Sequence, residues 1–304
     1  MSQKDTTDGI LDIKITYNCN NLCRFCEAGD KRKTFGDGSE DGIKKVLSEN
    51  RETYDRLVFS GGEPTLHRSL PELVRFAKHD LEYDTVQIRS NGRMFIYRDY
   101  CEKIIEAGAG RFAISVHGHC SACHDFLTGR KDSFVETVGG IRNLLELGQT
   151  VETRTVITKP NYRHLPEIAG LLISLNVRRF VFSYPNIAGT CERNVESIVP
   201  WMSLASPYVK KALDIAGSDG RLSLAEAIPA CMLAGFEDYI AGEQRFVGTV
   251  MDGSGAADDF SGHGKKSLKE KGPGCPGCRR FDRCEGVWPD YPVYFGWEEF
   301  EPLK

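Results

Sequence analysis

This chain of 304 residues contains six short runs rich in β-branched residues, and a stretch with helical periodicity separates each run from the next. The runs lie at residues 10–16, 57–60, 86–89, 112–116, 151–157 and 180–182. The helical patterns lie at residues 40–49, 69–79, 98–107, 133–147 and 165–175. Alternation of this kind predicts an α/β fold with a parallel sheet and helical crossovers, here a partial (β/α)6 TIM-like barrel. We expect the active site at the carboxyl ends of its strands.

Cys19, Cys23 and Cys26 follow the first run in the pattern C-x3-C-x2-C. Three thiolates on one short loop can bind three irons of a cubane [4Fe–4S] cluster and leave the fourth iron open to a reactant, because soft thiolates suit iron–sulfur chemistry. A structural zinc site would require a fourth nearby ligand and usually contains C-x2-C pairs. None of the four residues after Cys26 is Cys or His. The spacing therefore favours an iron–sulfur cluster over zinc or structural thiols.

This cysteine pattern resembles that of the radical S-adenosylmethionine (radical SAM) enzymes, and three further segments extend the resemblance. They are Ser-Gly-Gly-Glu-Pro at residues 60–64, Ser-Asn-Gly at 90–92 and Ser-Val-His-Gly at 115–118. Each lies at the end of a predicted strand, in the order expected for that family. The resemblance implies a partial barrel and an open iron that binds the amino and carboxylate groups of S-adenosylmethionine (SAM).

The resemblance also implies which side chains bind SAM. These residues are Phe25, Gly61, Gly62, Glu63, Asn91, Ser115 and Arg130. Phe25 would lie near the adenine, the glycine-rich segment near the methionyl amino group, and Ser115 near the ribose. A guanidinium suits the SAM carboxylate, and Arg130 matches the family position better than Arg154. Either arginine could instead be a surface or ion-pair residue.

A second group of cysteines consists of Cys275, Cys278 and Cys284, in the pattern C-x2-C-x5-C, with Cys231 upstream. Four thiolates complete either a second cubane cluster or a tetrahedral zinc site, and ligand chemistry alone does not choose between them. The spacing resembles the SPASM extension of radical SAM enzymes or its shorter twitch form. One further SPASM cysteine is missing, with Trp288 in its place, which implies a twitch-like domain with one auxiliary [4Fe–4S] cluster.

Pro200 and Pro207 flank an expected change of domain. We expect the radical SAM barrel over residues 1–205 and a small twitch-like iron–sulfur domain over residues 206–304, with a helix at residues 208–217. Residues 248–274 are rich in Gly, Ser and charge, which predicts a mobile loop. A lid over the substrate is the alternative for this segment.

The resemblance implies radical chemistry but leaves its outcome open. One electron from the reduced cluster would cleave SAM to methionine and a 5′-deoxyadenosyl radical, which removes hydrogen from a substrate C–H bond. We expect oxidation, such as dehydrogenation or cross-linking, with the auxiliary cluster as electron acceptor. The first alternative is an epimerase, in which a thiol of Cys120, Cys123 or Cys191 returns a hydrogen atom. A second alternative, from another class, is a non-catalytic iron–sulfur or zinc protein.

Residues 117–124 combine three histidines with a C-x2-C-H pattern, which also occurs in metal and haem sites. The segment follows the fourth predicted strand, where the family carries a loop near SAM, and no complementary ligand pair is nearby. We therefore expect loop residues here, some of them facing the pocket.

Composition excludes several classes of protein and partner. The net charge of −4 offers no electrostatic reason to bind nucleic acid or an anionic membrane. The sequence contains no apolar run of about 18 residues and no apolar core of a secretory signal near its start. Because no secretory signal is expected, the eleven cysteines suit cofactor ligation or reduced thiols in the cytoplasm better than disulfides. The expected partners are a small-molecule or peptide substrate and an external one-electron reductant such as flavodoxin or ferredoxin.

Overall fold

The computed structural model describes residues 9–241, 248–251, 257–259 and 269–304. Its strands are β1 (Ile10–Thr16), β2 (Arg56–Gly61), β3 (Thr85–Ser90), β4 (Arg111–Ser115), β5 (Thr150–Val156), β6 (Arg179–Ser183), β7 (Leu222–Glu226), β8 (Gly248–Met251) and β9 (Ala257–Asp259). Within the described residues they form one sheet in the order β7-β6-β5-β4-β3-β2-β1-β8-β9. Every neighbouring pair is parallel except β8 and β9. The predicted α/β partial barrel is confirmed.

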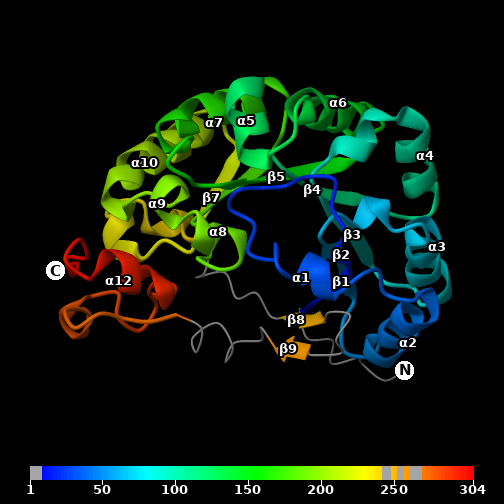
Figure 1. Ribbon diagram of the computed structural model, residues 1–304, viewed down its shortest axis with the longest axis horizontal. Coiled ribbons are helices and arrows are strands. Elements are labelled where there is room, and N and C mark those ends of the chain that lie inside the picture. Colours follow the sequence, from blue (N-terminus) through cyan, green and yellow to red (C-terminus); the bar gives the residue numbers. More distant parts are fainter. Residues whose placement is uncertain (1–8, 242–247, 252–256, 260–268) are drawn as a thin grey trace.

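Most of the described helices lie between successive strands in the sequence, and the longer ones cover one face of the sheet. They are α1 (Lys31–Thr34), α2 (Glu40–Asn50), α3 (Leu70–Arg75), α4 (Arg98–Glu106), α5 (Ser121–Thr128), α6 (Ser133–Glu146), α7 (Leu165–Ser174), α8 (Thr190–Arg193), α9 (Val195–Ile198), α10 (Met202–Ser218) and α12 (Asp290–Phe295). Figure 1 shows α2, α3, α4, α6, α7 and α10 in an arc outside the strands. Among the described residues, no helix has the length and apolar character needed to cross a membrane.

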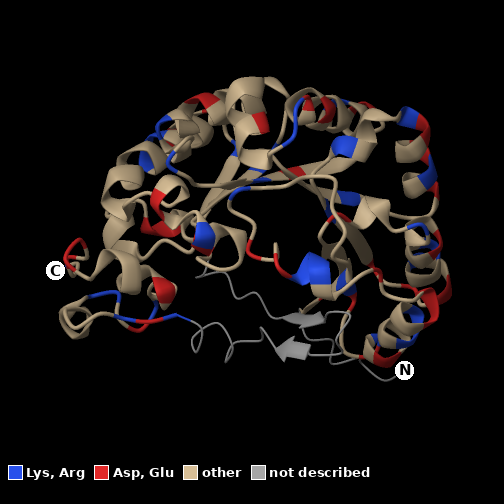
Figure 2. Ribbon diagram, viewed as in Figure 1, with Lys and Arg blue, Asp and Glu red and all other residues tan. Residues whose placement is uncertain are grey.

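Alternation along β1 explains the two faces of the sheet. Leu11, Ile13 and Ile15 are buried in the core formed with the helices. Asp12 and Lys14 alternate with them and therefore point to the opposite face, because successive side chains of a strand leave it on opposite sides. Figure 2 shows most charged residues on the outer helices and a smaller number along the strands.

Ion pairs join strands on the face opposite to the helices. Arg89 of β3 donates to Asp12 of β1 (2.6 Å), and Arg154 of β5 donates to Glu226 of β7 (2.6 Å). These pairs bridge strands that are not neighbours in the sheet. They make that face of the sheet polar, in contrast to the apolar face under the helices.

The sequence predicted six strands, and the described sheet contains more. The predicted six correspond to β1–β6, and β7 extends the parallel series beyond them. Leu, Ser, Ala and Glu of β7 have weak strand propensity, so pairing with β6 decides its conformation. The expected loop at 248–274 includes β8 and β9, and residues 252–256 and 260–268 lie outside the described residues.

The proposed domain boundary near residue 205 falls inside α10, which begins six residues earlier than the predicted helix and contains Pro207. Beyond it, β7 pairs with the barrel strand β6. The C-terminal segment then packs beside this edge of the sheet, where Figure 1 shows α12. The division into two domains stays a prediction.

Candidate functional site

The loop between β1 and α1 carries the three N-terminal cysteines, and backbone hydrogen bonds fix its course. The N–H groups of Leu22 and Arg24 donate to carbonyls at the C-terminal end of α5, at 2.8 and 2.9 Å. The carbonyl of Cys26 accepts from the N–H of Thr190 in α8, at 2.9 Å. In Figure 1 this blue loop passes between α5 and α8. It therefore lies at the carboxyl ends of the strands that precede those helices.

Donor groups surround the sulfur atoms of this loop. The N–H of Asn21 donates to Sγ of Cys19 (3.4 Å), and the guanidinium of Arg32 donates to Sγ of Cys26 (3.8 Å). Burial raises the pKa of Cys19 and of Cys23, and the negative charges of its two companions raise the pKa of Cys23 further. A bound metal relieves both effects, because a coordinating thiol is deprotonated and its charge is neutralised. The donor set therefore fits a cationic iron–sulfur cluster.

Gly61 and Gly62 lie directly against the backbone that leads into the cysteine loop. The N–H of Gly62 donates to the carbonyl of Thr16 (2.7 Å), and the N–H of Glu63 donates to that of Asn18 (2.8 Å). A Cβ at Gly62 would lie 2.4 Å from the Asn18 oxygen, and one at Gly61 would lie 2.1 Å from the Thr16 oxygen. Gly61 also has a φ of +130°, which other residues rarely adopt. Only glycine allows these two segments to approach so closely.

The carboxylate of Glu63 is fully buried and joins the ends of β2 and β3. Its Oε1 accepts from the N–H and hydroxyl of Thr65 (3.1 and 2.6 Å) and from the hydroxyl of Ser90 (2.7 Å). Its Oε2 accepts from the N–H of Asn91 (2.6 Å). Burial raises the pKa of Glu63, while these hydrogen bonds act in the opposite direction. In this arrangement Glu63 holds the two strand-end segments together.

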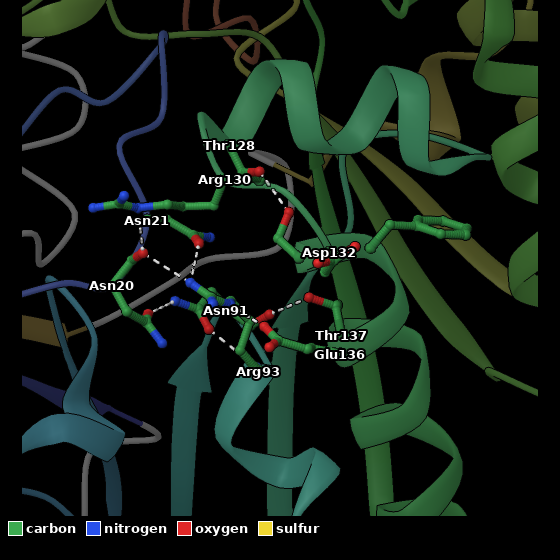
Figure 3. Close-up of polar contacts among 12 residues, drawn as sticks. Asn20, Asn21, Asn91, Arg93, Thr128, Arg130, Asp132, Glu136 and Thr137 are labelled. Carbon is green, nitrogen blue, oxygen red and sulfur yellow. Dashed lines mark hydrogen bonds and ion pairs between the residues drawn. The ribbon is translucent and has the colours of Figure 1, made fainter.

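Asn91 and Arg93 connect the end of β3 to the cysteine loop (Figure 3). The amide of Asn91 donates to Oδ1 of Asn20 (2.7 Å) and, over 3.9 Å, to Sγ of Cys19. Arg93 donates to the carbonyl of Asn20 (2.7 Å) and to Oδ1 of Asn21 (3.0 Å). Asn91 is predicted from the sequence as a site residue, and Arg93 is not. The position of Arg93 directly after Ser-Asn-Gly was the signal that could have found it.

The two arginines considered for the SAM carboxylate have different surroundings. Arg130, an exposed residue after α5, donates through Nε to the carbonyl of Asn20 (3.0 Å), and Figure 3 shows it beside the cysteine loop. Arg154 is paired with Glu226, which also accepts from the hydroxyl of Ser183 (2.7 Å). The carboxylate-binding role of Arg130 stays a prediction.

Phe25 and Ser115 lie at the end of β4. The ring of Phe25 contacts that of His117, with centroids 4.5 Å apart. Ser115 is the last residue of β4, is half-buried and pairs in register with Arg154 of β5. Asn161 donates to the carbonyl of His117 (2.9 Å) and so fixes the chain direction after the strand. The contact with His117 therefore places Phe25 of the cysteine loop beside the end of β4.

The four C-terminal cysteines, Cys231, Cys275, Cys278 and Cys284, line one cavity with an empty volume of about 440 Å³, part of it open to solvent. Burial raises the pKa of Cys231 to about 12, and the negative charges of the other three cysteines contribute to this shift. The fold therefore brings Cys231 to its distant partners, as a shared ligand role requires. The aromatic residues Phe281, Trp297 and Phe300 also line the cavity.

The C-terminal cysteines belong to short local structures. Cys231 lies in the 3-10 turn Ala230–Leu233, and Cys275 begins the turn Cys275–Gly277. Two backbone hydrogen bonds between Glu270 and Val287 (2.8 and 2.9 Å) close the segment that contains the C-x2-C-x5-C pattern. Over the ranges that the structure describes, no three His, Cys, Asp or Glu side chains converge closely enough to hold one metal ion.

The three candidate hydrogen donors occupy two places. Cys191 in α8 is fully buried, and burial, with the charges of Glu27 and Cys26, raises its pKa to about 12. Cys191 is therefore close to the cysteine loop. Cys120 and Cys123 lie together at the start of α5, and both are half-buried.

Comparison with known proteins gives a family match over the first half of the chain. The sequence model described as "Radical SAM superfamily" matches residues 13–172, which is more than half of the chain. The Fe-coproporphyrin III synthase of Methanosarcina barkeri is 31% identical over 177 residues, or 58% of this chain and 43% of that protein. The probable GTP 3′,8-cyclase of Saccharolobus solfataricus is 31% identical over 153 residues, or 50% of this chain and 48% of that protein. The matched regions thus span less than half of either relative.

Solved structures share the fold over nearly the full chain. SuiB of Streptococcus suis bound to S-adenosylmethionine superposes with a TM-score of 0.69 and 16% identity, covering 98% of this chain and 78% of that chain. The enzyme anSMEcpe with bound AdoMet and the Kp18Cys peptide superposes with a TM-score of 0.67 and 15% identity, covering 92% of this chain and 88% of that chain.

Proposed function

The chain belongs to the radical SAM superfamily, and from this premise we propose that it is an oxidase of a substrate C–H bond that uses SAM and an auxiliary iron–sulfur cluster. Members of this superfamily use a [4Fe–4S] cluster and SAM. The observation that carries the proposal is a set of hydrogen bonds that joins Gly62, Glu63 and Asn91 to the three-cysteine loop and to the backbone leading into it. It joins three sequence motifs at the carboxyl ends of β1, β2 and β3.

We assign the first cluster to Cys19, Cys23 and Cys26. When bound, cluster and SAM together supply a 5′-deoxyadenosyl radical that removes hydrogen from the substrate. The protein residues orient and shield the reactants. Gly61 and Gly62 allow the backbone that leads into the cysteine loop to approach the end of β2, and donor groups contact the sulfur atoms of Cys19 and Cys26.

The other members of the SAM site follow from their positions around this loop. We assign Phe25 to the adenine, Ser115 to the ribose and Arg130 to the carboxylate. Support comes from the contact of Phe25 with the end of β4 and from the hydrogen bond between Arg130 and Asn20. We keep the SAM contacts that the motifs imply for Glu63 and Asn91, and both residues also position the loop through hydrogen bonds within the protein.

We assign the auxiliary cluster to Cys231, Cys275, Cys278 and Cys284, in a twitch-like region within residues 206–304. A zinc ion requires sulfur atoms about 2.3 Å from a single point. A cubane cluster instead binds each thiolate to a different iron. Four thiolates suit either group, and the resemblance of the C-x2-C-x5-C spacing to the twitch pattern supports the choice of a cluster. Ligation by four cysteines leaves that cluster without an open iron, which suits electron transfer from a substrate radical.

The substrate proposed is a peptide or a small molecule, with flavodoxin or ferredoxin as the external reductant in the cytoplasm. One solved neighbour is SuiB bound to its precursor peptide SuiA, and another is anSMEcpe with a bound peptide. Both are distant relatives by sequence, at 14% and 15% identity, so they support this choice by fold alone.

The first experiment measures SAM cleavage. After anaerobic reconstitution with iron and sulfide, the protein reduced with dithionite should form 5′-deoxyadenosine from SAM. Cys23→Ala should abolish this product, because the cluster loses one of three ligands. Cys101→Ala is the matched control, since Cys101 is buried in α4 and its thiol donates to the carbonyl of Phe95. Absence of 5′-deoxyadenosine from the reconstituted wild-type protein would refute the proposal and favour a non-catalytic protein.

The second experiment counts metals. The reconstituted protein should contain about eight irons per chain, and Cys278→Ala with Cys284→Ala should reduce this to about four while SAM cleavage remains. A protein that contains about four irons and one zinc ion would overturn the assignment of an auxiliary cluster, but not that of the first cluster. Epimerisation would be favoured if Cys191→Ser stopped product formation but not 5′-deoxyadenosine formation.

A further inference from the structure

Helix α5 begins with two cysteines in a specific relation. Cys120 is the residue directly before the helix and has extended backbone angles (φ −149°, ψ 165°), and Cys123 is the third helical residue. The N–H of His124 donates to the carbonyl of Cys120 (3.0 Å) and closes the first turn. Residues three positions apart on a helical turn lie on the same side of it, and the negative charge of Cys120 acts on Cys123. The two thiols are therefore adjacent, and both are free.

The two thiols have different environments. The thiol of Cys123 donates to the carbonyls of His117 (3.9 Å) and Pro160 (3.8 Å), and its Cβ lies 2.9 Å from where a Cβ on Gly118 would be. Burial raises the pKa of Cys123 to about 11, and the negative charge of Cys120 adds to this effect. The side chain of Cys120 makes no capping hydrogen bond to the helix. Both residues are half-buried, and their contacts distinguish them: two carbonyls hold the thiol of Cys123, whereas Cys120 does not cap the helix.

We propose that Cys120 and Cys123 form a thiol–disulfide exchange site, in which Cys120 attacks and Cys123 resolves. A C-x-x-C pair at the start of a helix that follows a β-strand suits this chemistry. A metal site is not favoured, because the Nδ1 atoms of the buried His117 and His124 already accept from the N–H groups of Val156 and His117. The proposal does not depend on SAM or on either cluster.

The substrate class is a low-molecular-weight or exposed protein disulfide. The thiolate of Cys120 attacks one sulfur, forms a mixed disulfide and releases the first thiolate. The sulfur of Cys123 then attacks the sulfur of Cys120, and the second thiol leaves with the proton of Cys123. In total the protein loses two electrons and two protons, and the co-reactant disulfide becomes two thiols.

Formation of the disulfide between Cys120 and Cys123 would change a contact near the proposed SAM site. The S–H of Cys123 holds the carbonyl of His117, whose ring packs on Phe25 of the cysteine loop. A disulfide has no S–H, so this contact is lost when the bond forms. The site therefore couples the thiol state of the protein to the chain segment beside Phe25.

The test uses the reconstituted protein under anaerobic conditions and glutathione disulfide as the probe. After incubation at a series of ratios of reduced to oxidised glutathione, free thiols are alkylated and the protein is digested with trypsin. Cleavage after Arg111 and Arg130 releases one peptide with Cys120 and Cys123 as its only cysteines. Cleavage after Arg98 and Lys103 releases Cys101 as an internal control.

We expect the first peptide to lose two hydrogens and to escape alkylation in a ratio-dependent way that dithiothreitol reverses, while Cys101 stays alkylated. Cys123→Ser should stop at a glutathione adduct on Cys120, and Cys120→Ser should not react. Absence of the internal disulfide at every ratio would overturn the proposal. Equal reaction of the two single variants would also overturn it, because the two thiols would then have no distinct roles. Neither result affects the SAM-cleavage experiment.

Discussion

Gly62 illustrates how one hydrogen atom in place of a side chain allows two segments to meet. Its N–H donates to the carbonyl of Thr16, and its Cα faces the carbonyls of Tyr17 and Asn18. These carbonyls belong to the backbone that enters the cysteine loop. The conformation of that loop therefore depends on the absence of a Cβ at a residue some forty positions away in the sequence.

We predict that Gly62→Ala displaces the cysteine loop. Its Cβ would lie 2.4 Å from the oxygen of Asn18, and overpacking of this kind costs about 1–3 kcal/mol. Iron content after reconstitution should fall, and urea denaturation should show the loss of stability. The matched control is Gly170→Ala, an exposed site in α7 with nothing within 4 Å of the new Cβ, which should gain about 0.5–1 kcal/mol. Unchanged iron content in Gly62→Ala would contradict the prediction.

Glu63 shows what a motif leaves open. The resemblance implied a contact with SAM, whereas the structure gives its carboxylate four protein donors. A motif identifies a residue that matters, but the direction of its side chain depends on the strands beside it. The direct contact with SAM stays a prediction.

The junction of β4 and α5 shows how an element positions the site through buried histidines. His124 is 1% exposed and its Nδ1 accepts from the N–H of His117 (3.2 Å). Burial lowers the pKa of His124 to about 4, with Asp125 raising it and Arg93 lowering it. Burial also lowers the pKa of His117. Both rings are therefore neutral in the folded protein near neutral pH.

Stability should consequently fall in mild acid. In the unfolded chain, His124 becomes protonated below about pH 6.5. In the folded protein it becomes protonated only near its lowered pKa of about 4. Between these two pH values the unfolded state therefore binds more protons than the folded state. The folded state loses stability as the pH falls through this range.

We predict that His124→Asn makes this loss smaller by about 2 kcal/mol between about pH 7.5 and pH 5. The asparagine oxygen can accept from the N–H of His117, and the side chain does not titrate. The measurement is the free energy of unfolding in urea at both pH values. His79→Asn, at an exposed position, should leave the pH dependence unchanged. An identical pH dependence in the His124 variant and the wild type would show that His124 does not contribute. Some dependence should remain because of His117.

At the scale of the whole molecule, the contact between the barrel and the C-terminal segment brings Cys275, Cys278 and Cys284 to Cys231. Tyr291 of α12 is fully buried, its ring packs on that of Tyr184 beyond β6 (5.5 Å), and its oxygen accepts from the N–H of Met202 at the start of α10 (3.0 Å). The hydroxyl of Tyr291 also donates to Glu299. One side chain thus connects the barrel edge with the segment after the cysteines.

We predict that Tyr291→Phe lowers the free energy of unfolding by about 1–3 kcal/mol, because the buried N–H of Met202 loses its acceptor. Tyr294→Phe on the same helix is the control, since Tyr294 is 45% exposed and its change should stay within about 0.5 kcal/mol. Chemical denaturation measures both. Equal stability of the two variants would contradict a role of Tyr291 in this joint.

The fold was predictable to a large extent because its signals are local. The alternation of strand-like and helical runs predicted the series β1–β6, and the spacing of Cys19, Cys23 and Cys26 predicts a metal-binding loop. The seventh strand was missed, since its residues have weak strand propensity and its conformation comes from pairing with β6.

The sequence by itself determined the family, the parallel sheet and the two groups of cysteines, because periodicity and spacing are properties of neighbouring residues. Only the tertiary structure brought Cys231 to the cavity of Cys275, linked Arg93 to the cysteine loop and gave the Glu63 carboxylate its donors. Such contacts join residues that lie far apart in the chain. They depend on how the strands and helices pack and on the direction in which each side chain then points. The spacing of residues along the sequence predicts neither the packing nor these directions.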